Sequence, residues 1–203
     1  MTKSLPTFHV TLAADLFSFF VPLLQQGVFV SAKAGGNIKS FLCERLGISP
    51  EYAEKRIQTV FADGQVVDDW NRTVLANGST LALSAAAPGL AGAILRRQGP
   101  LSTMRRPITY ELEKGPCGAI EGMITLKLFN LLVAELGPLV LEKGILLPGK
   151  DLDFFFRELP DDFWAKCREA RVDGKVVDCE SLREIGEFSR APFLGLTVRF
   201  TGK

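Results

Sequence analysis

Two segments of the chain carry the same pattern, Asp-Gly-X-Val-Val-Asp. The first reads FADGQVVDD over residues 61–69, and the second reads RVDGKVVDC over residues 171–179. Glycine adopts positive φ without a steric penalty and aspartate tolerates it better than most residues, so Asp-Gly between apolar runs is typical of a tight turn between strands. Each copy therefore predicts a strand, a turn and a second strand.

Further landmarks recur in the same order around the two turns. An alternating, β-branched run opens each copy, Val10-Thr11-Leu12 in the first and Ile124-Thr125-Leu126 in the second. A polar residue suited to an N-cap, Asn37 or Asp151, then precedes a helical stripe of apolar side chains. The stripes are Ile38, Phe41, Leu42 and Leu46 in the first copy and Leu152, Phe155, Phe156 and Leu159 in the second. We therefore predict a tandem duplication; the alternative is two unrelated α+β lobes that share one common turn.

The composition is that of an ordinary globular protein. The chain has 203 residues, of which 47% are hydrophobic and 23% are charged, which suits one large domain or two small ones. Lys and Arg total 24 against 23 Asp and Glu, and there are only 2 Trp and 2 Tyr. Balanced charge and few stacking side chains give no basis for a nucleic-acid track, so no nucleic-acid partner is expected.

Neither export nor membrane insertion is expected. The start, MTKSLPTFHVTLAADL, has no basic segment followed by an apolar core and a cleavage site, so we expect no signal peptide and a cytoplasmic location. The longest uncharged stretch, residues 79–95, is slightly too short to span a bilayer and is broken by Pro88, Gly89 and Gly92.

The predicted order is strand, strand, capped helix, strand, Asp-Gly turn, short strand, Asn-Gly-Ser turn and strand. This order resembles the β-grasp, or ubiquitin-like, fold. The segment from Ile57 to Gly92 is similar to the C-terminal half of bacterial sulfur carriers of the molybdopterin-synthase small-subunit and thiamin types. The resemblance implies an α+β protein of two tandem β-grasp lobes, each a mixed sheet with one main helix packed on it. The expected division is a first lobe at 1–92, a connecting segment with Gly, Pro and Arg at 93–121, and a diverged second lobe at 122–203.

The activity of a sulfur carrier is not expected to accompany the fold. Such carriers react through the free carboxylate of a terminal Gly-Gly, whereas Pro88-Gly89-Leu90-Ala91-Gly92 lacks that pair and the chain continues beyond it. Gly89 and Gly92 still mark a strand exit that could approach a partner's backbone closely. The alternative is a linker that only crosses to the second lobe.

Four arginines follow this exit without an acidic residue between them. They are Arg96, Arg97, Arg105 and Arg106, in a segment rich in turn residues. Paired guanidinium groups can hold a phosphate or carboxylate bidentately, which makes them candidate anion ligands together with Gly89 and Gly92. The alternative is a solvated linker whose arginines pair with acidic neighbours.

The candidates for catalytic chemistry are few. Cys117 lies between proline and glycine in KGPCGAIEG, so its thiol is a candidate reactive group, with a passive loop cysteine as the alternative. Cys43 and Cys167 fall among apolar residues of helical stretches, and the single histidine, His9, alternates with apolar residues on one face of a strand. No motif predicts a cofactor or a metal site.

These observations favour a non-catalytic binding or adaptor protein that engages a protein partner or a small anion. The alternatives are a diverged sulfur-transfer or cofactor-biosynthesis accessory, or a thiol-dependent enzyme that uses Cys117. The bulky apolar segments Leu16–Leu24 and Phe129–Val140 are expected to be covered, either between the lobes or in a homodimer.

Overall fold

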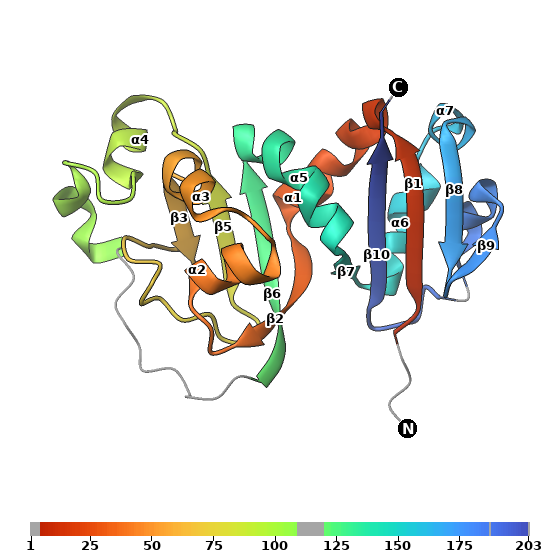
Figure 1. Ribbon diagram of the computed structural model, residues 1–203, viewed down its shortest axis with the longest axis horizontal. Helices are drawn as coiled ribbons and strands as arrows, with labels where there is room; N and C mark the ends of the chain where they lie inside the picture. The colour runs from red at the N-terminus through yellow and green to blue at the C-terminus, as the bar shows by residue number, and fades with distance from the viewer. Residues whose placement is uncertain (1–4, 109–119, 187, 203) are drawn as a thin grey trace. The chain divides into compact units, whose positions relative to one another are not determined.

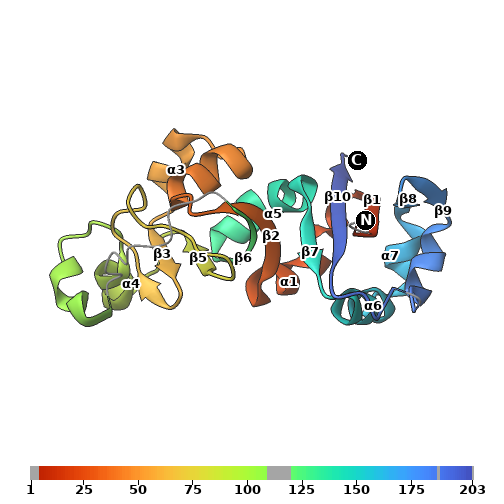
Figure 2. The same cartoon turned by 90° about the horizontal axis from the view of Figure 1, so that it is seen from below.

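The computed structural model describes residues 5–108, 120–186 and 188–202, and the fold is α+β (Figures 1 and 2). The chain forms two compact units. We call Leu23–Gly137 the middle unit, and Met1–Pro22 together with Pro138–Lys203 the terminal unit. The strands of each unit pair in both parallel and antiparallel directions and are accompanied by helices, so the expected α+β class is confirmed.

The middle unit has the strand order β4-β3-β5-β6-β2, in which β5 and β6 are parallel and the other neighbours antiparallel. The strands are β2 (Val28–Ala34), β3 (Thr59–Ala62), β4 (Gln65–Val66), β5 (Thr80–Ser84) and β6 (Ile120–Phe129). Its helical segments are α2 (Ile38–Ser40), η2 (Phe41–Arg45), α3 (Pro50–Arg56), α4 (Gly89–Leu95) and η3 (Ser102–Ile108).

The terminal unit has the order β7-β10-β1-β8-β9, in which β1 and β10 are parallel and the other neighbours antiparallel. The strands are β1 (Thr7–Ala13), β7 (Ile145–Leu147), β8 (Cys167–Val172), β9 (Lys175–Val177) and β10 (Leu194–Thr201). Its helical segments are η1 (Ala14–Phe20), α6 (Gly149–Glu158), α7 (Asp161–Ala165) and η4 (Cys179–Glu184). Two further helices, α1 (Val21–Gln26) and α5 (Leu131–Lys143), include the positions where the chain passes from one unit to the other.

Both Asp-Gly turns are confirmed, one between β3 and β4 and the other between β8 and β9. Asp63 and Asp173 each have a φ of 49°, and each is followed by a glycine with positive φ. The Asp63 carboxylate accepts a hydrogen bond from the amide of Thr80 at 2.7 Å, and the Asp173 carboxylate accepts one from the amide of Thr7 at 2.8 Å. Each turn is thus attached to the first residue of the neighbouring strand.

The strand pairing crosses the contiguous division at 1–92, 93–121 and 122–203. Strand β6, from the second half of the chain, pairs with β2 and β5, while β1 pairs with β8 and β10. The segment after β1 forms η1 and α1 rather than a tight hairpin, so β1 and β2 are not forced to be neighbours. Each compact unit therefore contains strands from both halves of the sequence.

The predicted helical stripes are buried, with one exception. Ile38, Leu42 and Leu46 are buried in the middle unit, and Leu152, Phe156 and Leu159 in the terminal unit, whereas Phe155 is only half-buried. Asn37 is the predicted N-cap, because its side chain accepts from the amide of Ser40 at 2.8 Å. The prediction for Asp151 was wrong: α6 begins earlier, after Pro148, and Asp151 lies in its first turn.

Candidate functional site

One face of the terminal unit's sheet carries polar side chains from three adjacent strands, β8, β1 and β10. The register places Arg171, His9 and Thr197 opposite one another in one row. The next row on the same face contains Glu169, Thr11 and Arg199. We call these side chains the polar face: His9, Thr11, Glu169, Arg171, Thr197 and Arg199.

The alternation of residues along β1 explains why this face is polar. Phe8, Val10 and Leu12 are buried on the core side, where Phe8 packs edge-on against Phe156 at 6.2 Å between ring centroids. His9 and Thr11 alternate with them and therefore point to the opposite side of the sheet. The polar residues of β8 and β10 follow the same alternation.

The polar face is a shallow hollow of about 420 Å³, bordered by Gly174 of the second Asp-Gly turn. The Arg171 guanidinium contacts the carboxylate of Glu169 on the same strand. Arg199 lies 3.6 Å from Glu142 of α5, and both side chains are largely exposed. These exposed ion pairs are weak, and both arginines remain accessible to another carboxylate.

The row that contains His9 is extended by β9. Val176 pairs with Arg171 in the register, so it continues the row beyond β8, and it is 66% exposed. An exposed apolar side chain next to hydrogen-bonding groups is a common arrangement in protein-binding surfaces. Because all these residues lie on paired strands, the sheet fixes the positions of their backbones before any partner binds.

The arginines singled out in the sequence lie elsewhere, in the middle unit. Arg105 is only 2% exposed and holds Asp68 through two hydrogen bonds of 2.9 and 2.6 Å. Arg97 lies over the ring of Trp70, 3.7 Å from its centroid, and pairs with Glu54 at 2.6 Å. Arg97 and Arg105 therefore reach two different acids on the body of the unit.

The remaining members of that set have separate environments. Arg96 is exposed at the end of α4, and the side chain of Arg106 lies outside the described residues. Gly89 starts α4 with a φ of 73°. A Cβ on Gly92 would lie 1.9 Å from the carbonyl oxygen of Ala87, so this glycine permits close packing of α4. Gly89, Gly92 and Arg96 border a pocket of about 160 Å³, and their binding role stays a prediction.

Asp68 is the point at which the segment from α4 to Arg105 is attached to the rest of the middle unit. Partial burial alone would raise the pKa of its carboxyl group, but hydrogen bonds from Arg105 and from the Gln98 amide, with the nearby Arg97 charge, hold the pKa below its usual value. The Gln98 amide donates to Asp68 at 2.8 Å. The segment from α4 to Arg105 is therefore attached to the rest of the middle unit at Asp68, in addition to the Arg97–Glu54 ion pair.

The cysteines offer little catalytic geometry within the described residues. Cys117 lies outside them, so its reactivity stays a prediction. Burial, together with a contact to the thiol of Cys179, raises the pKa of the Cys167 thiol, which disfavours a nucleophilic thiolate there. Among the described residues, no group of three or more His, Cys, Asp or Glu side chains could hold a metal ion.

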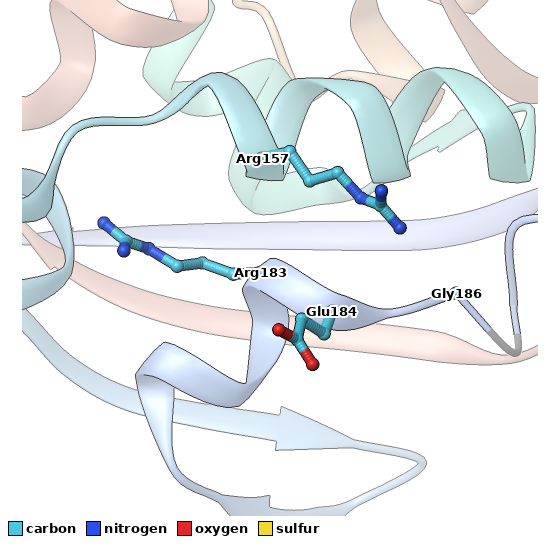
Figure 3. Close-up of a pocket in the computed structure, with 4 residues that line it drawn as sticks. All are labelled: Arg157, Arg183, Glu184 and Gly186. Atoms are coloured by element: carbon cyan, nitrogen blue, oxygen red, sulfur yellow. The ribbon is translucent and has the colours of Figure 1, made fainter.

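A wider hollow of about 640 Å³ in the terminal unit is bordered by Arg157, Arg183, Glu184 and Gly186 (Figure 3). The two guanidinium groups point in opposite directions, as Figure 3 shows. Arg157 pairs with Asp153 at 3.2 Å, and Arg183 pairs with Asp161. These arginines do not converge on a common point, so the hollow lacks the geometry of an anion clamp.

Comparison of the chain with known protein families, with curated protein sequences and with solved structures finds no match. No helix in the described part of the chain has the length and apolar character needed to cross a membrane.

Sequence reasoning placed His9 on a strand face but did not single out the other members of the polar face. Their signal was the outward position in alternating runs such as TFHVTLA and LGLTVRFT. That signal identifies which residues point away from the core. It cannot identify which strands are neighbours, and the polar face exists only because β8, β1 and β10 are adjacent.

Proposed function

We propose that the protein is a non-catalytic binding protein of the adaptor type, and that its polar face holds a partner protein through carboxylate groups. The observation that carries the proposal is the register of β8, β1 and β10, which aligns Arg171, His9 and Thr197 in one row and places Arg199 in the next. Guanidinium groups and hydroxyl groups on rigid strands are suited to binding carboxylates.

The charges favour an acidic partner segment. The six side chains of the face include two arginines and one glutamate, and a second glutamate, Glu142 of α5, lies 3.6 Å from Arg199 at its edge. Neighbouring strands lie about 4.8 Å apart, so the three strands present a surface that two or three residues of an extended segment can cover. Val176 at the end of the row supplies an apolar contact beside the charged ones.

We also propose that both units are variants of the β-grasp fold. Strand, capped helix, strand, Asp-Gly turn and short strand follow one another from β2 to β4 in the middle unit. The corresponding order runs from β7 to β9 in the terminal unit, although the N-cap there is Pro148. The exchange of strands between the halves of the chain is a departure from two separate lobes. An adaptor role is compatible with this fold and requires no terminal Gly-Gly.

The test uses an extended peptide of alternating Glu and Val as the probe, with amide chemical shifts as the measurement. We expect saturable changes on β8, β1 and β10 that weaken at high salt. The double variant Arg171→Glu and Arg199→Glu should abolish them. The matched control is Lys150→Glu with Arg190→Glu, which makes the same charge change at exposed positions of the same unit and should leave binding nearly intact. Equal losses in both variants, or shifts confined to α6, would contradict the polar face as the binding site.

A further inference from the structure

A hollow of about 350 Å³ lies in the middle unit between the end of β2 and η2. This volume is within the range of small-molecule pockets, about 300–1,000 Å³. Phe41 and Leu75 are both buried and form its apolar walls together with Ala32. The charged residues Lys33, Glu44 and Arg45 also border it. On β2 the side chain of Lys33 alternates with that of Ala32, and Lys33 lies opposite Glu121 of β6 in the register.

The loop that borders the hollow is fixed by hydrogen bonds. The Gly35 amide donates to the Leu75 carbonyl at 2.9 Å, and the Leu75 amide donates to the Gly36 carbonyl at 2.9 Å. The Asn37 side chain donates to the Asn71 carbonyl at 2.8 Å. Gly35 has a φ of 88°, which glycine adopts without strain. The hollow is therefore formed in advance, and a ligand does not have to order it.

The opposite wall contains an unusual helical turn. Phe41–Arg45 is a π-helix, in which the Leu46 amide donates to the Phe41 carbonyl at 3.1 Å. Such turns are rare and occur frequently at functional sites. Three of its residues, Phe41, Glu44 and Arg45, border the hollow. The irregular turn and the cavity thus coincide.

The charged residues that border the hollow form no ion pair with another described residue. Neither Lys33 nor Arg45 has an acidic partner within 4.0 Å among the described residues. Arg45 instead donates through Nε to the Ser31 carbonyl at 2.7 Å, which holds its guanidinium group in place. With Glu44 included, the border carries a net positive charge of one.

We propose that this hollow binds a small carboxylate with a flat apolar body. The apolar part would pack between Phe41 and Leu75, and the carboxylate would face Lys33 and Arg45. This inference does not depend on the polar face, which belongs to the other unit. A purely apolar ligand would leave both cations unused, and a simple inorganic anion would leave the apolar walls uncovered.

The experiment titrates the intact chain with phenylacetate at millimolar concentrations and follows amide chemical shifts. Two comparison ligands separate the contribution of the ring from that of the charge. 2-Phenylethanol has the ring without the charge, and acetate has the charge without the ring. We expect saturable shifts at residues 32–45 and 75 for phenylacetate, and much weaker changes for the other two. Binding of the alcohol as tightly as the acid, or shifts located elsewhere, would overturn the proposal.

Two variants and a matched control test the charges. Lys33→Gln should weaken phenylacetate binding about tenfold, as loss of a charged hydrogen bond implies. Glu44→Gln should strengthen it, because a like charge is removed from the border. Lys39→Gln removes an exposed lysine of α2 that does not border the hollow and should leave binding unchanged. Equal effects of Lys33→Gln and Lys39→Gln would show that phenylacetate responds only to the overall surface charge, and would contradict a specific site.

Discussion

The two units attach the same turn to strands of different origin. In the middle unit the turn carboxylate of Asp63 holds Thr80 of β5, which follows it closely in the same half of the chain. In the terminal unit the carboxylate of Asp173 holds Thr7 of β1, from the opposite end of the sequence. The local geometry is nearly identical, with a φ of 49° at both aspartates. The turn therefore selects a strand end that offers an amide, whatever its place in the chain.

The units also differ in the sheet face opposite the core. In the middle unit Thr59 lies on that face and is only 3% exposed, and it borders a pocket together with Gly89, Gly92 and Ala93 of α4. Figure 2 shows α3 and α4 on different sides of β3. In the terminal unit the corresponding face carries His9 and its neighbours and is open. The segment attached through Arg105 thus lies next to the buried Thr59 end of β3, whereas the corresponding face of the terminal unit borders an open hollow.

The largest loss of stability is expected when the segment from α4 to Arg105 is released from Asp68. Arg105→Met should lower the free energy of unfolding by about 3 kcal/mol, the low end for breaking a buried ion pair, because one-third of the Asp68 side chain is exposed. The control Arg96→Met changes an exposed arginine and should be nearly neutral. Urea unfolding of both variants measures the difference. A small loss for Arg105→Met would mean that the covering segment is held mainly by its other contacts.

The same ion pair predicts a pH dependence. The pKa of Asp68 is lowered in the folded protein, so its contribution to stability is complete above the unfolded value of about 3.9 and is lost as pH falls through the folded pKa. The stability difference between wild type and Arg105→Met should therefore shrink at the acid end of a pH series. A constant difference would show that the Asp68 charge is not the cause.

Gly92→Ala tests the close packing of α4. A Cβ would lie 1.9 Å from the Ala87 carbonyl oxygen, so the helix must move, at a cost of about 2 kcal/mol. We also expect faster tryptic cleavage after Arg96 as the segment loosens. Ala91→Ser, at an exposed position of the same helix, should change neither measurement. Unchanged cleavage in Gly92→Ala would separate the packing of α4 from the attachment at Arg105.

The turn aspartates test whether the two hairpins are equivalent in energy as well as in geometry. Asp63→Ala and Asp173→Ala should each cost about 1.5 kcal/mol, because each removes a charged acceptor from a backbone amide. The asparagine variants keep an acceptor and tolerate positive φ, so they should cost less. Thermal unfolding of the four variants provides the comparison. A cost at only one of the two aspartates would limit the equivalence to geometry.

The smallest change in stability is expected on the open face. Arg171→Gln with Arg199→Gln should alter the free energy of unfolding by no more than about 0.5 kcal/mol, because both arginines are exposed. Binding of the acidic probe peptide should nevertheless be strongly weakened. Set beside Arg105→Met, this variant separates an arginine that supports the fold from arginines available to a partner. A large loss of stability would assign Arg171 and Arg199 to the fold instead.

Local signals in the sequence predicted local structure well. The Asp-Gly turns, the apolar stripes and the Asn37 cap depend on residues within a few positions of one another, and each was found where expected. Asp151 was misassigned because Asp is favoured both as an N-cap and within the first turn, and Pro148 precedes the helix. The candidate site was harder to predict from the sequence. The predicted arginine set includes Arg105, which is bound to Asp68, a residue far away in the sequence.

The sequence by itself determined the turns, the buried stripes and the alternation that makes one side of β1 polar, because each follows from the backbone preferences or periodicity of adjacent residues. Only the tertiary structure decided that β1 lies between β10 and β8, and that β6 lies between β5 and β2. All strands present similar backbone amides and carbonyls, so the sequence of one strand does not indicate which distant strand will pair with it. The polar face combines residues from three distant segments for that reason, and no one of those segments contains it alone.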